Sequence, residues 1–377
     1  MKIQREKSRP LRVGIVVASL DIPGGHSVQA ARLMEGLAQE QGIAAQLIPI
    51  NPRLPRLLRW LQRIKYVRTI VTELLYLSRL LVQLPRCDVV HIFSAAYFSF
   101  LLAPAPALLL ARLLGKGVLL NYHSGEAEDH LRRQGRIALP LIRLADLVVV
   151  PSPWLVEVFA RFGVRATATS NTVDLQRFSF RARRPLRPVL LSNRNFEKHY
   201  NVAGVLRAFA LIQQQLPAAR LIVAGDGSER ARLQALAREL NLQHVEFTGA
   251  VAPAAMPALY DQADIFINAS AVDNTPLSII EAFAAGLPVV TTDAGGIPHL
   301  VRHEQTGLVV RCGDETALAQ SVLRLPADDA LAQRLIGQAR DECAKYTWAA
   351  VKAQWLSAYA ALAAKDRSEF QAVREFH

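Results

Sequence analysis

Short apolar runs alternate with helical patterns along most of this chain. In the first half, five runs are short, apolar and bounded by turn or charged residues, which is typical of buried strands: 12–19, 44–50, 87–93, 118–123 and 147–151. Segments between them, such as 27–41, carry apolar residues at helical spacing. Strands that alternate with helices predict a parallel, doubly wound sheet.

The second half repeats this scheme. Strands are predicted at 188–192, 219–224, 245–248, 265–268, 288–291 and 307–310. Helices are predicted at 202–215, 229–240, 253–262, 278–285 and 315–325, and again from 328 to about 364. The expected fold class is therefore α/β, with two Rossmann-like doubly wound domains that face a cleft.

The length of 377 residues suits two domains. We expect an N-terminal domain over 1–178 and a C-terminal domain over 179–345, joined by an Arg- and Pro-rich connection at 170–188. A C-terminal helix within 346–377 is expected to pack back on the first domain, and the chain beyond 365 is expected to fray.

Positive charge is concentrated in the first half. The chain carries a net charge of +12, and residues 1–178 hold 23 basic and 12 acidic side chains, a net of +11. The densest part is 53–86, where eight basic residues and one acid, Glu73, are interleaved with apolar residues. This pattern predicts a basic amphipathic helix at an anionic membrane surface. A solvated helix with one core face stays open as an alternative, whereas nucleic acid is disfavoured because no stacking aromatic pattern accompanies the charges.

Residues 92–111 form a run without charged side chains, and this run is long enough to suggest a transmembrane helix. A strand at its beginning and interruptions at Pro104 and Pro106 favour a buried strand, a loop and a core helix instead. The three cysteines show neither disulfide nor metal spacing, and the first ten residues lack an apolar signal sequence. We therefore expect a cytoplasmic protein, peripheral at the inner membrane face if the basic helix binds lipid.

The segment 270–292 contains the most specific chemistry. Asp273 is followed by the turn Asn274-Thr275-Pro276 and then by an apolar run from Leu277 that opens a helix carrying Glu281. A loop that leads into a helix N-terminus presents free N–H groups and a positive dipole end, so it binds anions. An anion site flanked by two carboxylates for hydroxyl groups suits a nucleotide-sugar.

Other candidate residues follow predicted strands. These residues are Gly24 and Gly25 after the first strand, His123, Arg194, Lys198, Gly225 and Val251. Alternatively, the cations lie on the surface, the glycines form tight turns and the histidine is structural. The carboxyl ends of parallel strands are where open α/β sheets bind ligands. The G-x-G-x-x-G pattern of a nicotinamide dehydrogenase is missing after the first strand, which disfavours that class.

These motifs resemble those of the retaining, nucleotide-sugar-dependent glycosyltransferases of family 4, which have the GT-B fold. The family's Glu-x7-Glu signature reads Asp273-x7-Glu281 here, and the shorter Asp is a departure from it. The resemblance implies that Glu281 holds the donor ribose and that Asp273 lies beside the sugar. It also implies that Arg194 and Lys198 clamp the diphosphate without a metal.

The resemblance further implies roles for the remaining positions. His123 would lie near the donor sugar, Gly24 and Gly25 near the donor phosphate or the acceptor, Gly225 near the nucleotide and Val251 near the base. The expected activity is retaining transfer from a UDP- or GDP-type sugar to a glycan or lipid-linked acceptor, in cell-surface polysaccharide or glycolipid synthesis. No cofactor is expected besides the nucleotide-sugar co-substrate. A GT-B nucleotide-sugar epimerase and a non-catalytic nucleotide-sugar-binding subunit stay open as alternatives.

Overall fold

The computed structural model describes residues 9–20, 25–54, 64 and 67–364, and they form two compact units. The N-terminal unit takes the described residues within Met1–Pro151, Leu155–Thr172 and Val351–His377. The C-terminal unit takes Ser152–Trp154 and Val173–Ala350. The sequence placed the corresponding boundaries at 178/179 and 345/346.

The N-terminal unit is built on a six-stranded parallel sheet in the order β2-β1-β3-β4-β5-β6. Its strands are β1 Leu11–Val17, β2 Ile43–Pro49, β3 Val89–Ser94, β4 Gly117–Tyr122, β5 Leu147–Val150 and β6 Thr167–Ala168. Chain order reverses between β1 and β3, which makes this the topological switch point of the sheet. The sequence prediction missed β6 because two residues are too few to show a period.

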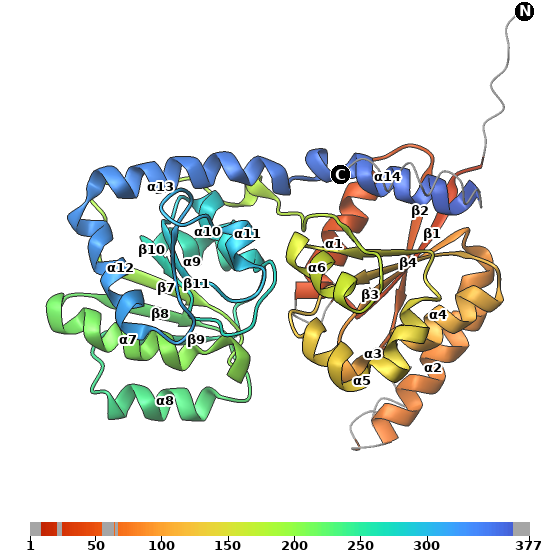
Figure 1. The fold of residues 1–377 in the computed structure, drawn as a ribbon, viewed down its shortest axis with the longest axis horizontal. Helices are drawn as coiled ribbons and strands as arrows, with labels where there is room; N and C mark the ends of the chain where they lie inside the picture. Colours follow the sequence, from red (N-terminus) through yellow and green to blue (C-terminus); the bar gives the residue numbers. More distant parts are fainter. Residues whose placement is uncertain (1–8, 21–24, 55–63, 65–66, 365–377) are drawn as a thin grey trace, which may run out of the picture. The chain divides into compact units, whose positions relative to one another are not determined.

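Helices lie on both faces of this sheet (Figure 1). They are α1 Gly25–Ala38, α2 Val67–Gln83 with the 3₁₀ turn η2 Leu84–Arg86, α3 Tyr97–Leu102, α4 Pro104–Leu113, α5 Ala127–Ile142, α6 Pro153–Arg161 and α14 Trp348–Ala364. The last of these brings the C-terminal part of the chain onto the N-terminal sheet. The hydroxyl of Tyr359 on α14 lies 2.7 Å from Nδ1 of the buried His91 on β3, and both side chains are inaccessible to solvent.

The uncharged run 92–111 folds as the end of β3 followed by α3 and α4. The strand and the core helix were predicted correctly, but α3 occupies the place of the predicted loop. Pro104 begins α4 instead of interrupting a helix, because the first helical position needs no backbone N–H donor. No helix in the described part of the chain is both long and apolar enough to cross a bilayer.

The C-terminal unit contains a second six-stranded parallel sheet, in the order β12-β11-β10-β7-β8-β9. Its strands are β7 Val189–Asn193, β8 Arg220–Ala224, β9 Val245–Gly249, β10 Ile265–Ile267, β11 Val289–Thr292 and β12 Leu308–Val310. Read from β9 to β12, the strand order is that of the dinucleotide-binding fold, in which the chain runs outward from the centre of the sheet in two halves. The topological switch point therefore lies between β7 and β10.

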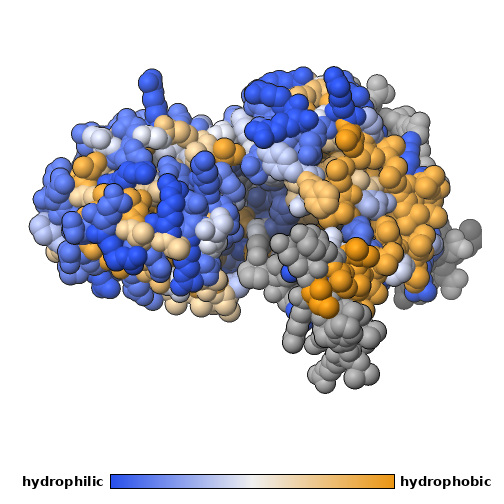
Figure 2. Space-filling model, turned by 90° about the horizontal axis from the view of Figure 1, so that it is seen from below, coloured by the Kyte–Doolittle hydropathy of each residue, from blue (hydrophilic) through white to orange (hydrophobic). Residues whose placement is uncertain are grey.

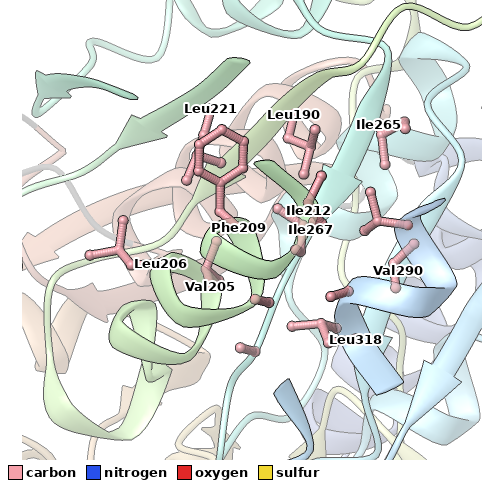
Figure 3. Close-up of a cluster of buried hydrophobic side chains, with 14 of the residues drawn as sticks. Leu190, Val205, Leu206, Phe209, Ile212, Leu221, Ile265, Ile267, Val290 and Leu318 are labelled. Carbon is pink, nitrogen blue, oxygen red and sulfur yellow. The ribbon is translucent and has the colours of Figure 1, made fainter. Parts of the chain in front are cut away.

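Two apolar layers hold the helices of this unit on the sheet. The helices are α7 Val202–Gln215, α8 Arg230–Glu239, α9 Met256–Gln262, α10 Leu277–Ala285, α11 Ile297–Leu300, α12 Glu315–Ala327 and α13 Asp329–Glu342. On one face, side chains of α7 such as Phe209 and Ile212 are directed toward strand residues such as Leu190 and Leu221 (Figure 3). On the other face, α9 and α10 pack into a second buried cluster with Phe266 of β10.

Candidate functional site

An ion pair joins the two central strands of the C-terminal sheet at their carboxyl ends. Arg194 directly follows β7, and Asp273 lies in the loop after β10. Nη2 of Arg194 is 2.6 Å from Oδ2 of Asp273, and the two side chains are only 12% and 8% exposed. The pair therefore lies at the topological switch point, where sheets of this order bind their ligands.

Arg194 is held from two further directions. Its guanidinium carbon lies 3.9 Å from the ring centroid of Tyr200, which is a cation–π contact. Its Nη1 is 3.5 Å from Oγ of Ser278, in the first turn of α10, while its Nε is buried without a hydrogen-bond partner among the described residues. A fixed cation and the positive end of a helix dipole thus meet at one point.

Asp273 is fixed by its own loop. Ser270 Oγ lies 3.0 Å from Oδ2, and the backbone N–H of Asn274 donates to Oδ1 over 3.0 Å. Both carboxylate oxygens therefore have partners within the C-terminal unit. In this structure the shorter Asp side chain reaches Arg194, so its primary contact is the cation.

Two glycines after β11 allow their backbone to pack directly against the loop that carries Asp273. A side chain at Gly296 would place its Cβ 2.6 Å from the carbonyl oxygen of Asn274, and one at Gly295 would lie 2.2 Å from that of Asp273. The N–H of Gly296 donates to the same Asp273 carbonyl over 3.2 Å. Any side chain here would push the Asp273–Asn274 backbone away, so these glycines serve the loop geometry.

Glu281 lies one turn into α10, a helix whose residues Ser278–Ala285 are all buried. The hydroxyl of Tyr260 lies 3.1 Å from Oε2 of Glu281 and 3.2 Å from Nδ2 of Asn193, at the end of β7. Burial, followed by the nearby Glu281 carboxylate, holds the pKa of Tyr260 far above its usual value, so the hydroxyl keeps its proton. The neutral Tyr260 hydroxyl therefore lies between Glu281 and the backbone carbonyl of Ser278, which it meets at 3.0 Å.

The second predicted cation, Lys198, is not brought to Arg194. It begins the short 3₁₀ turn Lys198–Tyr200, is exposed, and lines a surface pocket together with Arg207 and Arg232. The side chain that contacts the Arg194 guanidinium is Tyr200, two residues further on. The diphosphate role of Lys198 followed from the family resemblance and stays a prediction.

Gly225 and Val251 lie after β8 and β9. Gly225 has φ +144° and packs so closely that a Cβ would lie 2.1 Å from the Arg194 carbonyl oxygen, so this glycine supports the Arg194 loop directly. Val251 is half-buried against the cluster that includes α10. The remaining residues of the predicted anion loop, Thr275, Pro276 and Leu277, lead into α10 as expected, with Pro276 as its N-cap.

In the N-terminal unit, His123 directly follows β4 and is surrounded by rings. Its ring is stacked 5.3 Å from Phe93 and meets His26 edge-on, also at 5.3 Å. Burial first, and then the neighbouring His26 and His91, hold the pKa of His123 well below its usual value. The imidazole is therefore neutral, and its Nε2 is buried without a hydrogen-bond partner among the described residues.

The predicted glycine loop is described only in part. Gly25 is the first residue of α1, and a side chain there would meet no atom of the described residues within 4 Å. Gly24 lies outside the described residues. Gly25 directly precedes His26, whose ring meets His123.

Tyr200, Tyr260 and Ser270 are site residues that the sequence reasoning missed or ranked low. Tyr260 is 21 positions before Glu281, and no spacing rule relates them. Tyr200 sits six positions after Arg194 in a turn with no regular period, so only its aromatic character next to the cationic motif could have indicated the contact.

Comparisons with known proteins agree with this geometry. Residues 23–177 match the family described as Glycosyltransferase Family 4, and residues 177–342 match the family described as Glycosyl transferases group 1. The GDP-mannose-dependent alpha-(1-6)-phosphatidylinositol monomannoside mannosyltransferase of Mycobacterium tuberculosis is 30% identical over 291 residues, covering 68% of this chain and 73% of that protein. The chain belongs to glycosyltransferase family 4. The family predicted from the motifs is thereby confirmed.

Other relatives of this family-4 member extend the comparison. The phosphatidyl-myo-inositol mannosyltransferase of Mycobacterium leprae is 24% identical over 376 residues, covering 94% of this chain and 97% of that protein. The sulfoquinovosyl transferase SQD2 of Arabidopsis thaliana is 29% identical over 287 residues, covering 70% of this chain. The match spans only 54% of the length of that plant relative.

Solved structures confirm the predicted fold class. Sucrose-phosphate synthase from Thermosynechococcus elongatus superposes with a TM-score of 0.74 at 20% identity, covering 94% of this chain and 99% of that one. Anabaena HepE in complex with UDP gives a TM-score of 0.71 at 17% identity, covering 93% and 100% of the two chains. Two Rossmann-like units of the GT-B type are therefore present in this chain.

Proposed function

We propose that this family-4 protein is a retaining glycosyltransferase that uses a UDP- or GDP-type sugar. The observation that carries the proposal is the position of Arg194, which is paired with Asp273 and touches Ser278 in the first turn of α10. A guanidinium and a helix N-terminus at a topological switch point suit the two negative phosphates of a nucleotide diphosphate.

The chemistry follows from where charge develops. When the glycosidic bond to the donor phosphate breaks, negative charge grows on the departing diphosphate, and Arg194 and the positive end of the α10 dipole stabilise it without rearrangement. Glu281, oriented by Tyr260, is placed to accept hydrogen bonds from ribose hydroxyls. Val251 contacts the base in this scheme, and Asp273 faces both Arg194 and the sugar.

We assign a front-side mechanism to the transfer. The acceptor oxygen bonds to the anomeric carbon on the face from which the diphosphate leaves, and the departing phosphate oxygen takes the acceptor proton. No protein nucleophile is needed, and the anomeric configuration is retained. Donor binding through Arg194 and α10 requires no metal ion in this scheme.

We assign the acceptor to the N-terminal unit, near His123 and Gly25. Relatives whose names contain phosphatidylinositol support a lipid-linked or glycan acceptor. The excess of 23 basic over 12 acidic side chains in residues 1–178 supports an anionic acceptor or its membrane. The product then belongs to a cell-surface polysaccharide or glycolipid, made at the inner membrane face.

The test is transfer of sugar from a panel of UDP- and GDP-sugars to lipid extracts and oligosaccharides, in the presence of EDTA, with the anomeric configuration of the product read by NMR. We expect one donor to give a product of retained configuration. Asp273→Asn should lower kcat on the order of 10²-fold, because the Asp273 carboxylate orients Arg194 and faces the sugar. Nucleotide affinity should be unchanged or tighter, because the Asp273 carboxylate no longer competes for the Arg194 guanidinium.

Three other outcomes would each contradict part of this proposal. Interconversion of free nucleotide-sugars without an acceptor would indicate an epimerase. Nucleotide binding with no transfer to any acceptor, and gain of activity in Asp273→Glu, would indicate a binding subunit that has lost catalysis. An inverted product would contradict the front-side mechanism.

A further inference from the structure

Helix α2 carries an apolar stripe that faces solvent. Ile70, Leu74, Leu77 and Leu81 are spaced by four, three and four residues, so they line one side of the helix. They are 61%, 63%, 36% and 60% exposed. Globular helices normally bury such a stripe, so its exposure calls for an explanation.

The stripe is not the face by which α2 packs on its own unit. That face is formed by Tyr76 and Leu80, the two fully buried residues of the helix, and the hydroxyl of Tyr76 donates to the carbonyl of Ala103 at the start of α4 over 2.7 Å. The helix is therefore anchored on one side and leaves a second apolar side free among the described residues.

Neighbouring helices enlarge this apolar surface. Helix α4 packs beside α2, and α3 packs beside α4. These two helices expose Phe98, Leu109 and Leu113, the last of which is 83% exposed. All but one of the large apolar side chains exposed in the described residues belong to the N-terminal unit, the exception being Phe180. Figure 2 shows the orange side chains gathered on this unit, whereas the visible face of the other unit is mostly blue.

The same region is strongly basic. On α2, Arg68 and Arg79 lie on the side of the helix opposite to the stripe, and Arg86 follows the helix in η2. None of the three forms an ion pair with an acid of the described residues, and Glu73 is the one acid of α2. The residues that lead into α2 in the sequence, 55–66, add four basic side chains and no acid. A helix with apolar side chains on one side and unneutralised cations on the other suits the boundary between acyl chains and anionic headgroups.

We propose that the exposed side of α2, together with Phe98, Leu109 and Leu113, is a docking surface for an anionic lipid bilayer. This inference rests on the proposed function, since it names the surface from which a lipid-linked acceptor would be drawn. A second copy of the chain is the weaker occupant, because it would bring together two units that carry the same strong positive charge. In this proposal the side chains enter the headgroup and upper acyl region, and the described helices lie on the bilayer without crossing it.

The test is flotation of the full chain with vesicles of phosphatidylcholine, with and without phosphatidylglycerol. We expect the wild type to float with anionic vesicles and not with neutral ones at moderate salt. The variant Leu74→Gln/Leu81→Gln should lower the partition coefficient by roughly tenfold or more, because two apolar side chains no longer insert. The variant Thr69→Gln/Ser78→Gln, which adds the same residue type to the same helix outside the stripe, should stay within about twofold of the wild type.

A charge-matched pair tests the second part of the proposal. Arg68→Gln/Arg86→Gln should weaken binding to anionic vesicles by roughly tenfold, since each cation near the surface contributes to attraction. Arg220→Gln/Arg238→Gln, two exposed arginines of the C-terminal unit, should have little effect. All variants should retain the thermal midpoint and the nucleotide affinity of the wild type, so that loss of folding or of the donor site is detected separately.

Specific outcomes would overturn the proposal. If the wild type binds nucleotide normally but does not bind anionic vesicles, the docking surface is rejected and the proposed transferase function is unaffected. A stripe variant that floats like the wild type rejects these residues as the surface. A wild-type dimer that Leu74→Gln/Leu81→Gln converts to a monomer, without vesicle binding, assigns the stripe to a second copy instead.

Discussion

Arg194 is the residue on which the donor site depends, because three different side chains constrain its guanidinium. Asp273 balances its charge, Tyr200 covers its face, and Ser278 marks its position at the start of α10. Such a guanidinium loses little side-chain freedom when a diphosphate binds, which is the physical meaning of preorganisation.

Tyr200 should therefore matter through Arg194. Replacing it by Leu removes the cation–π contact, which is typically about 0.5–1 kcal/mol at such a site, and should weaken nucleoside diphosphate binding by roughly two- to fivefold. Tyr200→Phe keeps the ring and should bind like the wild type. Titration calorimetry of both variants decides this, and equal losses in Phe and Leu would assign the effect to the hydroxyl.

The sequence predicted the charged members of the site but not their supports. Arg194, Asp273 and Glu281 follow strands or open a helix, so the strand order of a doubly wound sheet was enough to bring them together. Tyr260 and Tyr200 act through contacts that depend on the exact path of the loops, and no period in the sequence encodes that path. Lys198 shows the reverse case. Its position in the sequence suggested a place beside Arg194, but its side chain lines a different surface pocket.

At the level of elements, the strands were predicted well because each is a compact apolar run in a sheet covered on both faces. The missed pieces are short, namely β6 with two residues and α3 with six. The four-residue helix α11 was not predicted either. Such elements owe their conformation to tertiary packing, so local patterns do not reveal them.

The packing of α14 on the N-terminal sheet has a measurable consequence through His91. Burial lowers the pKa of His91 from 6.5 to about 3, and that of His26 from 6.5 to about 4. The unfolded chain therefore takes up protons first as the pH falls, so stability present above 6.5 is lost progressively below it. Each of these histidines should lower the free energy of unfolding by about 2 kcal/mol when the pH falls from about 7 to about 5.

Denaturant unfolding of the wild type and His91→Gln at these two pH values tests this expectation. The variant starts less stable, because it loses the contact with Tyr359, but its free energy of unfolding should fall by about 2 kcal/mol less than that of the wild type. An equal fall in both proteins would mean that His91 is protonated, or exposed to water, in the folded state.

At the scale of the whole molecule, two units of the same architecture carry different charges and surfaces. The C-terminal unit holds an ion pair, a buried helix and few exposed apolar side chains, which suits a small charged donor. The N-terminal unit holds the positive charge, the neutral histidines and nearly all of the exposed apolar side chains, which suits a lipid-linked acceptor. Composition alone indicated this asymmetry of charge, but the exposed stripe of α2 became visible only with the structure.

The most direct test of the central claim is calorimetric titration of UDP and GDP, in EDTA, into the wild type, Arg194→Gln, Arg194→Gln/Asp273→Asn and Lys198→Gln. We predict that the wild type binds one of the nucleotides. Both Arg194 variants should weaken that binding by roughly 30-fold, about 2 kcal/mol for a lost charge-assisted hydrogen bond, whereas Lys198→Gln should stay within about threefold. The double variant excludes the uncompensated Asp273 carboxylate as the cause. Binding of neither nucleotide, or equal affinity of the wild type and the double variant, would contradict the donor site described for Arg194 and α10.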